Sequence, residues 1–247
     1  MAVEWMLEAT ARAEDQHFWF TGLRRNARRL LDRAVHGRRL DRIVDCGAGT
    51  GRNLDWLREY GPAVGIERSP TGLRIGRMHN RPLIQGTVTQ LPFADASAAL
   101  LTSFDVLYCL DDASEQAAVR EMWRVLRPGG LLLVNVAALE ILHGSHSTLT
   151  MEVRRYTKTR LRQLLAGAGF TIDRLTFTNM TTFPLTLAVR MADRLSGRAK
   201  TASDADFKIP SRPINAALSG VLAAESKVMG WVNLPIGTSL MCLAHKQ

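Results

Sequence analysis

A glycine-rich turn between a short apolar run and a helical pattern constrains this chain more than any other feature. Residues 42–54 read Arg-Ile-Val-Asp-Cys-Gly-Ala-Gly-Thr-Gly-Arg-Asn-Leu. The apolar pair predicts a buried strand, and leucines at positions 54 and 57 have helical spacing. Strand, glycine turn and helix form the layout of a nucleotide site in a parallel sheet, because glycines allow close approach of the backbone and a helix N-terminus offers N–H groups.

The spacing of the glycines and the neighbouring acids narrow the class of ligand. A dinucleotide fingerprint is spaced G-x-G-x-x-G, whereas the glycines here are spaced G-x-G-x-G and follow Asp45. A carboxylate at the end of the strand disfavours a pyrophosphate and favours a cationic ligand. The run 63–67 predicts a second strand that ends in Glu67, a carboxylate placed to accept hydrogen bonds from two ribose hydroxyls. These features disfavour an NAD enzyme.

These residues resemble the motifs of a known family, the class I S-adenosylmethionine (SAM) dependent methyltransferases. The sequence VDCGAGTG is similar to the family's first motif, VGIERSP to its second, and RVLRPGGLLLVNV to a further segment. The resemblance implies an α/β fold with a doubly wound, seven-stranded, mostly parallel sheet, whose seventh strand inserts antiparallel between the fifth and sixth. It also implies SAM as the methyl donor, S-adenosylhomocysteine as the product, and no metal.

The resemblance extends to the expected cofactor site. The segment GTVTQLPF at 86–93 is similar to the family's adenine-binding segment, but Thr87 stands where the family usually has an acid. A threonine hydroxyl can still accept one hydrogen bond from the adenine amino group, and Val88 would lend its backbone N–H. The expected cofactor-binding residues are Asp45, Gly47, Gly49, Gly51, Glu67, Arg68, Thr87, Val88 and Ser103.

The acceptor is expected beside the loops that follow the fourth and fifth strands, since ligands bind outside the carboxyl ends of parallel strands. The segment FDVLYCLDD at 104–112 resembles the family's L-D-V-L-E-H-L-D-D, with Tyr108-Cys109 in place of Glu-His. Tyr108 could donate a hydrogen bond to the acceptor or could simply pack. The expected substrate-binding residues are Trp19, Phe104, Tyr108, His143, Arg154 and Arg155.

The loop at 143–156 supplies the candidate catalytic residues. It resembles the H-D-x-x-x-G-H-x-R-R-Y-T segment of a subset of small-molecule methyltransferases, with His146, Arg154, Arg155 and Tyr156 at matching positions. Alignment accelerates methyl transfer, and a base is needed only if the acceptor is protonated in its reactive form. His146 is the predicted base, because its unperturbed pKa lies near neutrality, with Tyr156 beside it. The alternative is that both residues merely hold the loop.

Helices are expected at the N-terminus and in an insertion late in the chain. Residues 4–35 carry an apolar stripe opposite a row of arginines. The run His17-Phe-Trp-Phe followed by a basic helix resembles the N-terminus of the same subset and either packs or closes over the ligand. The expected units are a lid (1–40), a SAM-binding core (41–180 and 236–247) and a helical insertion (181–235). The insertion is longer than a connection requires, and it serves either as a cap over the acceptor, which we favour, or as a membrane-docking surface.

Composition limits the remaining possibilities. The net charge of +9 comes mostly from arginine and suits nucleic acid, an anionic membrane or solvated helices. An appended RNA-binding module is absent from the sequence, and residues 103–106 lack the N-P-P-Y motif of exocyclic amine methylation. Three widely spaced cysteines argue against zinc and disulfides. The sequence lacks a signal peptide and any membrane-spanning run, so a cytoplasmic protein is expected.

The sequence therefore predicts a SAM-dependent methyltransferase of a small molecule, such as a natural product or a glycan- or lipid-linked metabolite. The methylated atom, whether oxygen, nitrogen or carbon, stays open. One alternative is a nucleic-acid methyltransferase. Another is a SAM-binding partner subunit without catalysis, which the departures at Thr87, Tyr108-Cys109 and Met151-Glu152 would explain. Peripheral membrane contact and the choice between monomer and homodimer are also open.

Overall fold

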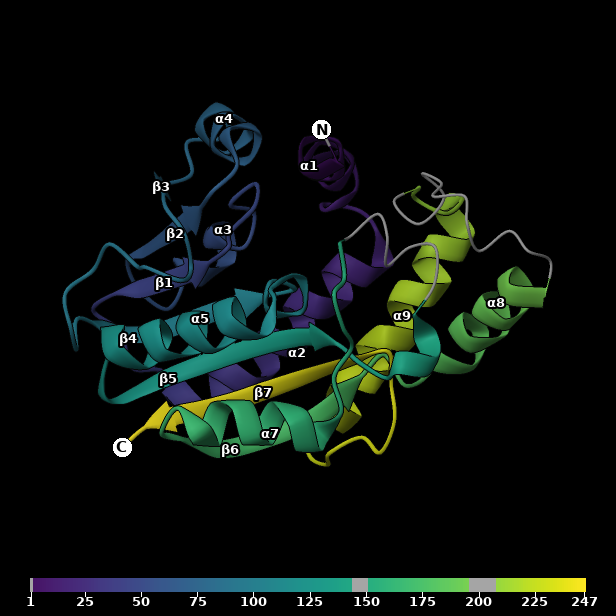
Figure 1. The fold of residues 1–247 in the computed structure, drawn as a ribbon. Helices are drawn as coiled ribbons and strands as arrows, with labels where there is room; N and C mark the ends of the chain where they lie inside the picture. The colour runs from purple at the N-terminus through teal and green to yellow at the C-terminus, as the bar shows by residue number, and fades with distance from the viewer. Residues whose placement is uncertain (1, 144–150, 196–207) are drawn as a thin grey trace.

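The computed structural model describes residues 2–143, 151–195 and 208–247. Its helices and strands alternate along most of the chain (Figure 1). In chain order they are α1 (Ala2–Ala13), α2 (Phe18–Val35), β1 (Ile43–Cys46), α3 (Leu54–Leu57), β2 (Ala63–Glu67), α4 (Pro70–Met78), β3 (Leu83–Gln85), β4 (Ala98–Phe104), η1 (Leu107–Cys109), α5 (Asp112–Val125), β5 (Leu126–Ala137), η2 (Glu140–Leu142), α7 (Lys158–Gly167), β6 (Phe170–Thr178), α8 (Phe183–Leu195), α9 (Arg212–Met229) and β7 (Ser239–Lys246).

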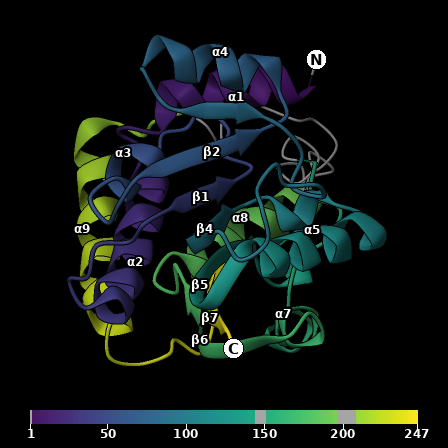
Figure 2. The same ribbon diagram turned by 90° about the vertical axis from the view of Figure 1, so that its left-hand side faces the viewer.

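The strands form one seven-stranded sheet in the order β3-β2-β1-β4-β5-β7-β6. Strand β7 is antiparallel to both β5 and β6, and the other neighbouring pairs are parallel. Helices α2, α3 and α9 cover one face of the sheet, and α5 and α7 cover the other (Figure 2). This arrangement confirms the predicted doubly wound α/β fold. The strand order reverses between β1 and β4, which is where ligands bind in such sheets.

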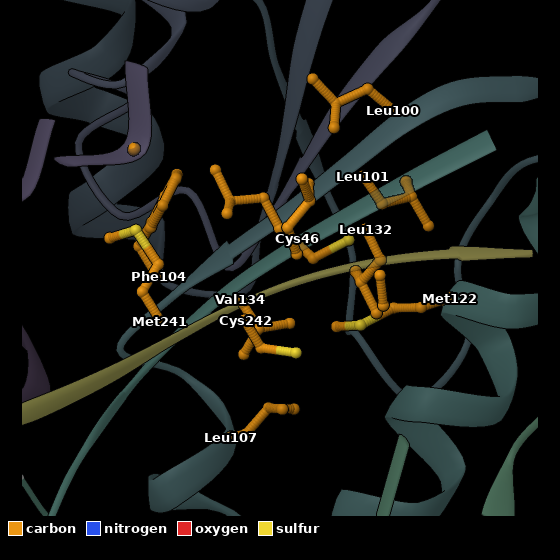
Figure 3. Packing of buried hydrophobic residues seen from close by; sticks show 14 of the residues in the cluster. Cys46, Leu100, Leu101, Phe104, Leu107, Met122, Leu132, Val134, Met241 and Cys242 are labelled. Atoms are coloured by element: carbon orange, nitrogen blue, oxygen red, sulfur yellow. The ribbon is translucent and has the colours of Figure 1, made fainter. Parts of the chain in front are cut away.

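The core lies between the central strands and the helices on both faces. Strands β1 and β4 are buried along their whole length, as expected for parallel strands with both faces covered. Figure 3 shows Leu101 and Leu132 of the sheet with Met122 of α5 in this packing. Strand β5 begins at Leu126, which pairs with Ala98 of β4.

The predicted continuous helix at 4–35 is two helices. The backbone of His17 is extended, and its ring Nδ1 accepts a hydrogen bond from the Trp19 N–H at 3.2 Å, so His17 caps the start of α2. Most of α2 belongs to the core, with Ala27, Leu30 and Leu31 fully buried. The part of 1–40 that can face a ligand is α1 with the first two turns of α2.

The insertion at 181–235 also divides into two parts. Helix α9 packs along α2: a Cβ on Gly22 would lie 2.8 Å from Leu222 Cδ1, and the side chain of Asn215 bonds the Phe18 N–H and the Gln16 carbonyl. Glu225 of α9 accepts hydrogen bonds from the backbone N–H and hydroxyl of Thr181, both at 2.7 Å. Helix α9 is thus a layer of the fold, whereas α8 lies at the rim beside η2.

Candidate functional site

A cavity of about 790 Å³ lies at the carboxyl ends of β1, β2 and β4. Its size is typical of a small-molecule site, which is usually about 300–1,000 Å³. The walls come from the glycine turn, the loops after β2, β3, β4 and β5, the helix α1, the first two turns of α2, and α8. The strand ends and the two helical segments therefore meet around one site, as the topology predicts.

Glu67 is fixed by the glycine turn and by the start of α4. Its Oε2 accepts a hydrogen bond from the Gly49 N–H at 2.8 Å, and its Oε1 accepts one from the Ser69 N–H at 2.6 Å. Gly49 has a φ of +58°, in the left-handed region that favours glycine, and this conformation brings its N–H to the carboxylate. Each carboxylate oxygen can accept a further hydrogen bond. Glu67 therefore faces the cavity as an oriented acceptor for a diol.

Asp45 lies on β1 behind the glycine turn and does not line the cavity. Its Oδ1 accepts a hydrogen bond from the Thr102 hydroxyl at 2.6 Å, and its Oδ2 is buried without a hydrogen-bond partner among the described residues. Burial raises the pKa of Asp45 to about 7, and the nearby charge of Glu67 adds to this effect. A cationic ligand nearby would favour the ionised carboxylate.

The other expected cofactor residues divide into two groups. Arg68, Thr87 and Val88 line the cavity together with Gly47. The Thr87 hydroxyl lies 2.9 Å from the Thr89 hydroxyl, so it already shares one hydrogen bond within its own turn. Outside the cavity wall are Gly51, which packs against Arg81 and Leu83, and Ser103, whose hydroxyl is buried within β4.

Only some of the residues predicted to bind the methyl acceptor line the cavity. Trp19, Phe104, Tyr108 and Arg155 line the cavity. Arg155 forms a buried ion pair with Glu152, with Nε–Oε2 and Nη2–Oε1 distances of 2.9 and 3.0 Å.

Three predicted residues of the 143–156 loop lie away from the cavity wall. His143 is outside the lining, and Arg154 pairs with Asp112 and Glu115 at 2.8 and 3.0 Å. Tyr156 is fully buried and its hydroxyl donates to Glu115, an arrangement that raises the pKa of Tyr156 above its ordinary value. This burial separates Tyr156 from the site. The predicted base, His146, falls outside the described residues.

Arg24 of α2 is a residue of the cavity wall that the sequence did not single out. Its Nη2 donates a hydrogen bond to the Glu14 carbonyl at 2.6 Å, and burial lowers its pKa to about 10. The Glu14 carboxylate in turn accepts from the Thr50 hydroxyl at 2.7 Å, so the junction of α1 and α2 is tied to the glycine turn. In the sequence, Arg24 is one of a row of arginines, and nothing there distinguishes it.

Asp105 is a second residue that sequence reasoning missed. Its φ is +62°, a conformation that is uncommon for residues other than glycine and that occurs at functional sites. Asn135 of β5 holds it twice: the Asp105 N–H donates to the Asn135 carbonyl at 3.0 Å, and Asn135 Nδ2 donates to Oδ1 at 2.9 Å. Asp105 lines the cavity, and loss of solvent raises its pKa to about 7, with Glu152 raising it further and Arg155 lowering it.

The fold and the position of this cavity are similar to those of class I SAM-dependent methyltransferases. Residues 44–134 match the family model described as a methyltransferase domain, and these residues contain the glycine turn, Glu67 and Asp105. In the part of the chain that the structure describes, no three His, Cys, Asp or Glu side chains are grouped as they would be to hold a metal.

Known proteins similar to this chain agree with that class. The chain is 40% identical over 96 residues to a demethylmenaquinone methyltransferase of Corynebacterium kroppenstedtii, covering 38% of this chain and 41% of the relative. It is 36% identical over 153 residues to the enzyme of that name from Renibacterium salmoninarum, covering 60% of each. The chain thus matches between two fifths and three fifths of these relatives' length. A SAM-dependent methyltransferase structure from Thermotoga maritima has the same fold, with a TM-score of 0.61, 19% identity, and coverage of 100% of this chain and 98% of that one.

Proposed function

We propose that this protein transfers the methyl group of SAM to a small, largely apolar acceptor bound in the cavity. The observation that carries this proposal is the Glu67 carboxylate, fixed by two backbone N–H groups at the wall of a cavity lined by aromatic side chains. A rigid acceptor for a ribose diol beside an apolar chamber suits a nucleoside cofactor with a second, less polar ligand.

The residues present fit SAM. Glu67 would hold the ribose hydroxyls, Val88 and Thr87 the adenine, and Arg24 the carboxylate of the methionine end. Asp45 lies behind the cavity wall, and a bound sulfonium would favour the ionised form of this carboxyl group over the protonated form. When bound, SAM supplies an electrophilic methyl group on a sulfonium. The glycine turn at 47–51 allows the backbone to approach this ligand closely.

We propose a quinol as the acceptor class. The relatives named as demethylmenaquinone methyltransferases support this choice, and so does the wall built from Trp19, Phe104 and Tyr108. A flat aromatic ring packs well against such side chains. Helix α8 completes the wall with Leu185 and Val189, so an apolar chain attached to the ring has apolar partners.

Among the described residues, Asp105 is the carboxylate that best suits a general base. It lies in the cavity wall, Asn135 fixes its orientation, and its pKa of about 7 suits proton transfer near neutrality. Asp105 would take the hydroxyl proton of a quinol, leaving electron density on the oxygen and the conjugated ring carbon. The ion pair of Glu152 and Arg155 would set the charge around it. His146 stays a prediction for the same role.

The experiment that tests the proposal combines binding and turnover. Calorimetry should show SAM binding, and incubation with isotopically labelled SAM and a short-chain demethylnaphthoquinol should give a labelled product by mass spectrometry. Absence of SAM binding would overturn the proposal. Tight SAM binding without transfer, relieved only when a second protein is added, would instead identify a partner subunit.

A further inference from the structure

Helix α8 differs from α9 in what it buries. None of the α8 residues whose side chains are described is buried, whereas α9 buries Leu222 and Met229. Helix α8 lies at the edge of the molecule, beside η2 (Figure 1). An amphipathic helix normally buries its apolar side, so the apolar side of α8 lacks a covering element among the described residues.

The exposed apolar side chains of α8 form a continuous surface. Leu185, Val189, Met191 and Leu195 are 61%, 48%, 47% and 87% exposed. Their spacing places them on one broad side of the helix. Ile141 of η2, which packs beside α8, is 51% exposed and extends this surface. We call these five residues the α8 surface.

The α8 surface borders the cavity. Leu185 and Val189 line the cavity and are still largely exposed, so the cavity reaches the molecular surface here. Arg190 and Arg194 follow each other at helical spacing on another side of α8. Arg194 Nη2 donates to the carbonyls of Ile141 and His143 at 2.9 and 2.8 Å, which fixes the helix to η2 and places a cation beside the apolar residues.

A bilayer with anionic lipids suits this combination better than a second copy of the chain. Apolar residues with neighbouring arginines are typical of helices that lie in the bilayer interface, with the cations near anionic head groups. The net charge of +9 favours an anionic bilayer as the partner over a second, equally basic copy of this chain. In the described part of the chain, no helix is long and apolar enough to cross a membrane, so α8 would lie on it. A second copy on the α8 surface would also cover the opening of the cavity.

We propose that the α8 surface docks onto anionic lipid bilayers and turns the opening of the cavity toward the lipid. Docking goes beyond the proposed methyl transfer and does not depend on it. A lipophilic acceptor could then enter between Leu185 and Val189 without crossing water, and this consequence alone depends on the proposed function.

Vesicle sedimentation without SAM or acceptor tests the docking. The protein should sediment with vesicles of equimolar phosphatidylcholine and phosphatidylglycerol, and less with phosphatidylcholine alone. The double variant Met191→Asp with Leu195→Asp should reduce binding about tenfold or more, because it replaces two exposed apolar groups outside the cavity wall with anions. Arg194→Glu should also weaken binding.

Matched variants on other helices show whether a loss of vesicle binding is specific to substitutions on the α8 surface. Val228→Asp on α9 replaces an apolar residue that is about as exposed as Met191, and Arg120→Glu on α5 removes an exposed cation elsewhere. Both variants should bind vesicles like the wild type. Unchanged melting temperatures will show that the variants fold. Sedimentation that the α8 variants leave unchanged would overturn the proposal. So would a homodimer, measured by light scattering, that the same variants dissociate. Failure of methyl transfer with normal vesicle binding would count against the proposed function alone.

Discussion

At the scale of single residues, the Glu67 carboxylate is predicted to bind the ribose of SAM, and it also accepts two backbone hydrogen bonds within the protein. Glu67→Ala should weaken SAM binding by about 30–150-fold, the equivalent of about 2–3 kcal/mol, because two ribose hydroxyls lose their acceptor. It should also lower the melting temperature, since the N–H groups of Gly49 and Ser69 lose theirs. Calorimetry and thermal unfolding measure the two effects.

Glu121 provides the control for Glu67, because it accepts the Leu91 N–H at 2.7 Å outside the cavity. Glu121→Ala should lower the melting temperature and leave SAM affinity unchanged. Wild-type SAM affinity in Glu67→Ala would show that the ribose lies elsewhere.

The raised pKa of Asp105 predicts that the stability of the protein depends on pH. Its folded-state pKa of about 7 lies above the ordinary value of about 3.9. The folded state therefore keeps a proton that the unfolded state has lost. This contribution to stability is complete below pH about 4 and is lost as pH rises to about 7. Relative to Asp105→Asn, the wild type should lose unfolding free energy across that window and stay level above it, as urea unfolding can measure.

Asp45→Asn is the matched variant for Asp105→Asn, because burial also raises the pKa of Asp45 to about 7. Both variants should flatten the stability profile. Asp105→Asn alone should reduce methyl transfer at saturating SAM by about a hundredfold or more and remove the rise of the rate through pH about 7. Equal rates in the two variants would exclude Asp105 as the base.

Site residues whose position follows from the end of a strand could be predicted from the sequence. Residues whose position depends on contacts between separate segments could not. Glu67 follows directly from the end of its strand, and the structure places it in the cavity wall. Arg24 and Asp105 were missed because their positions in the cavity wall depend on contacts with Glu14 and Asn135, which no spacing rule in the sequence reveals. Tyr156 matches a motif, yet its hydroxyl is used by Glu115, a contact that spacing does not reveal.

At the scale of elements, the hydrophobic pattern located β1 and β2, the two strands around the glycine turn, to within a few residues. It could not locate the break between α1 and α2, because residues 4–35 are helical in pattern on both sides and the interruption depends on the His17 cap. Nor could it distinguish the surroundings of α8 from those of α9. Both have an apolar stripe, but that of α9 packs against α2, whereas that of α8 faces the cavity and the molecular surface.

At the scale of the whole molecule, the insertion contains one helix that belongs to the fold and one that belongs to the site. If 181–235 were only a cap over the acceptor, as the sequence predicts, its removal as a unit would leave SAM binding nearly intact. The structure argues against this expectation, because the loss of α9 would uncover α2 at Gly22 and remove the partners of Thr181 and Phe18.

Two replacements by Gly-Ser linkers of equal length test this division. Replacing 212–229, which forms α9, should abolish cooperative thermal unfolding, since Leu222 and Met229 leave the core and each large-to-small loss of this kind costs about 2–5 kcal/mol. Replacing 183–207, which includes α8, should preserve the melting temperature and the calorimetric SAM affinity, because the Glu67 carboxylate is held by the N–H groups of Gly49 and Ser69, both outside the replaced segment. The same replacement should lower methyl transfer to an apolar acceptor, since the cavity loses Leu185 and Val189. If instead the α9 replacement unfolds like the wild type and the α8 replacement does not fold, the roles of the two helices are the reverse of those described.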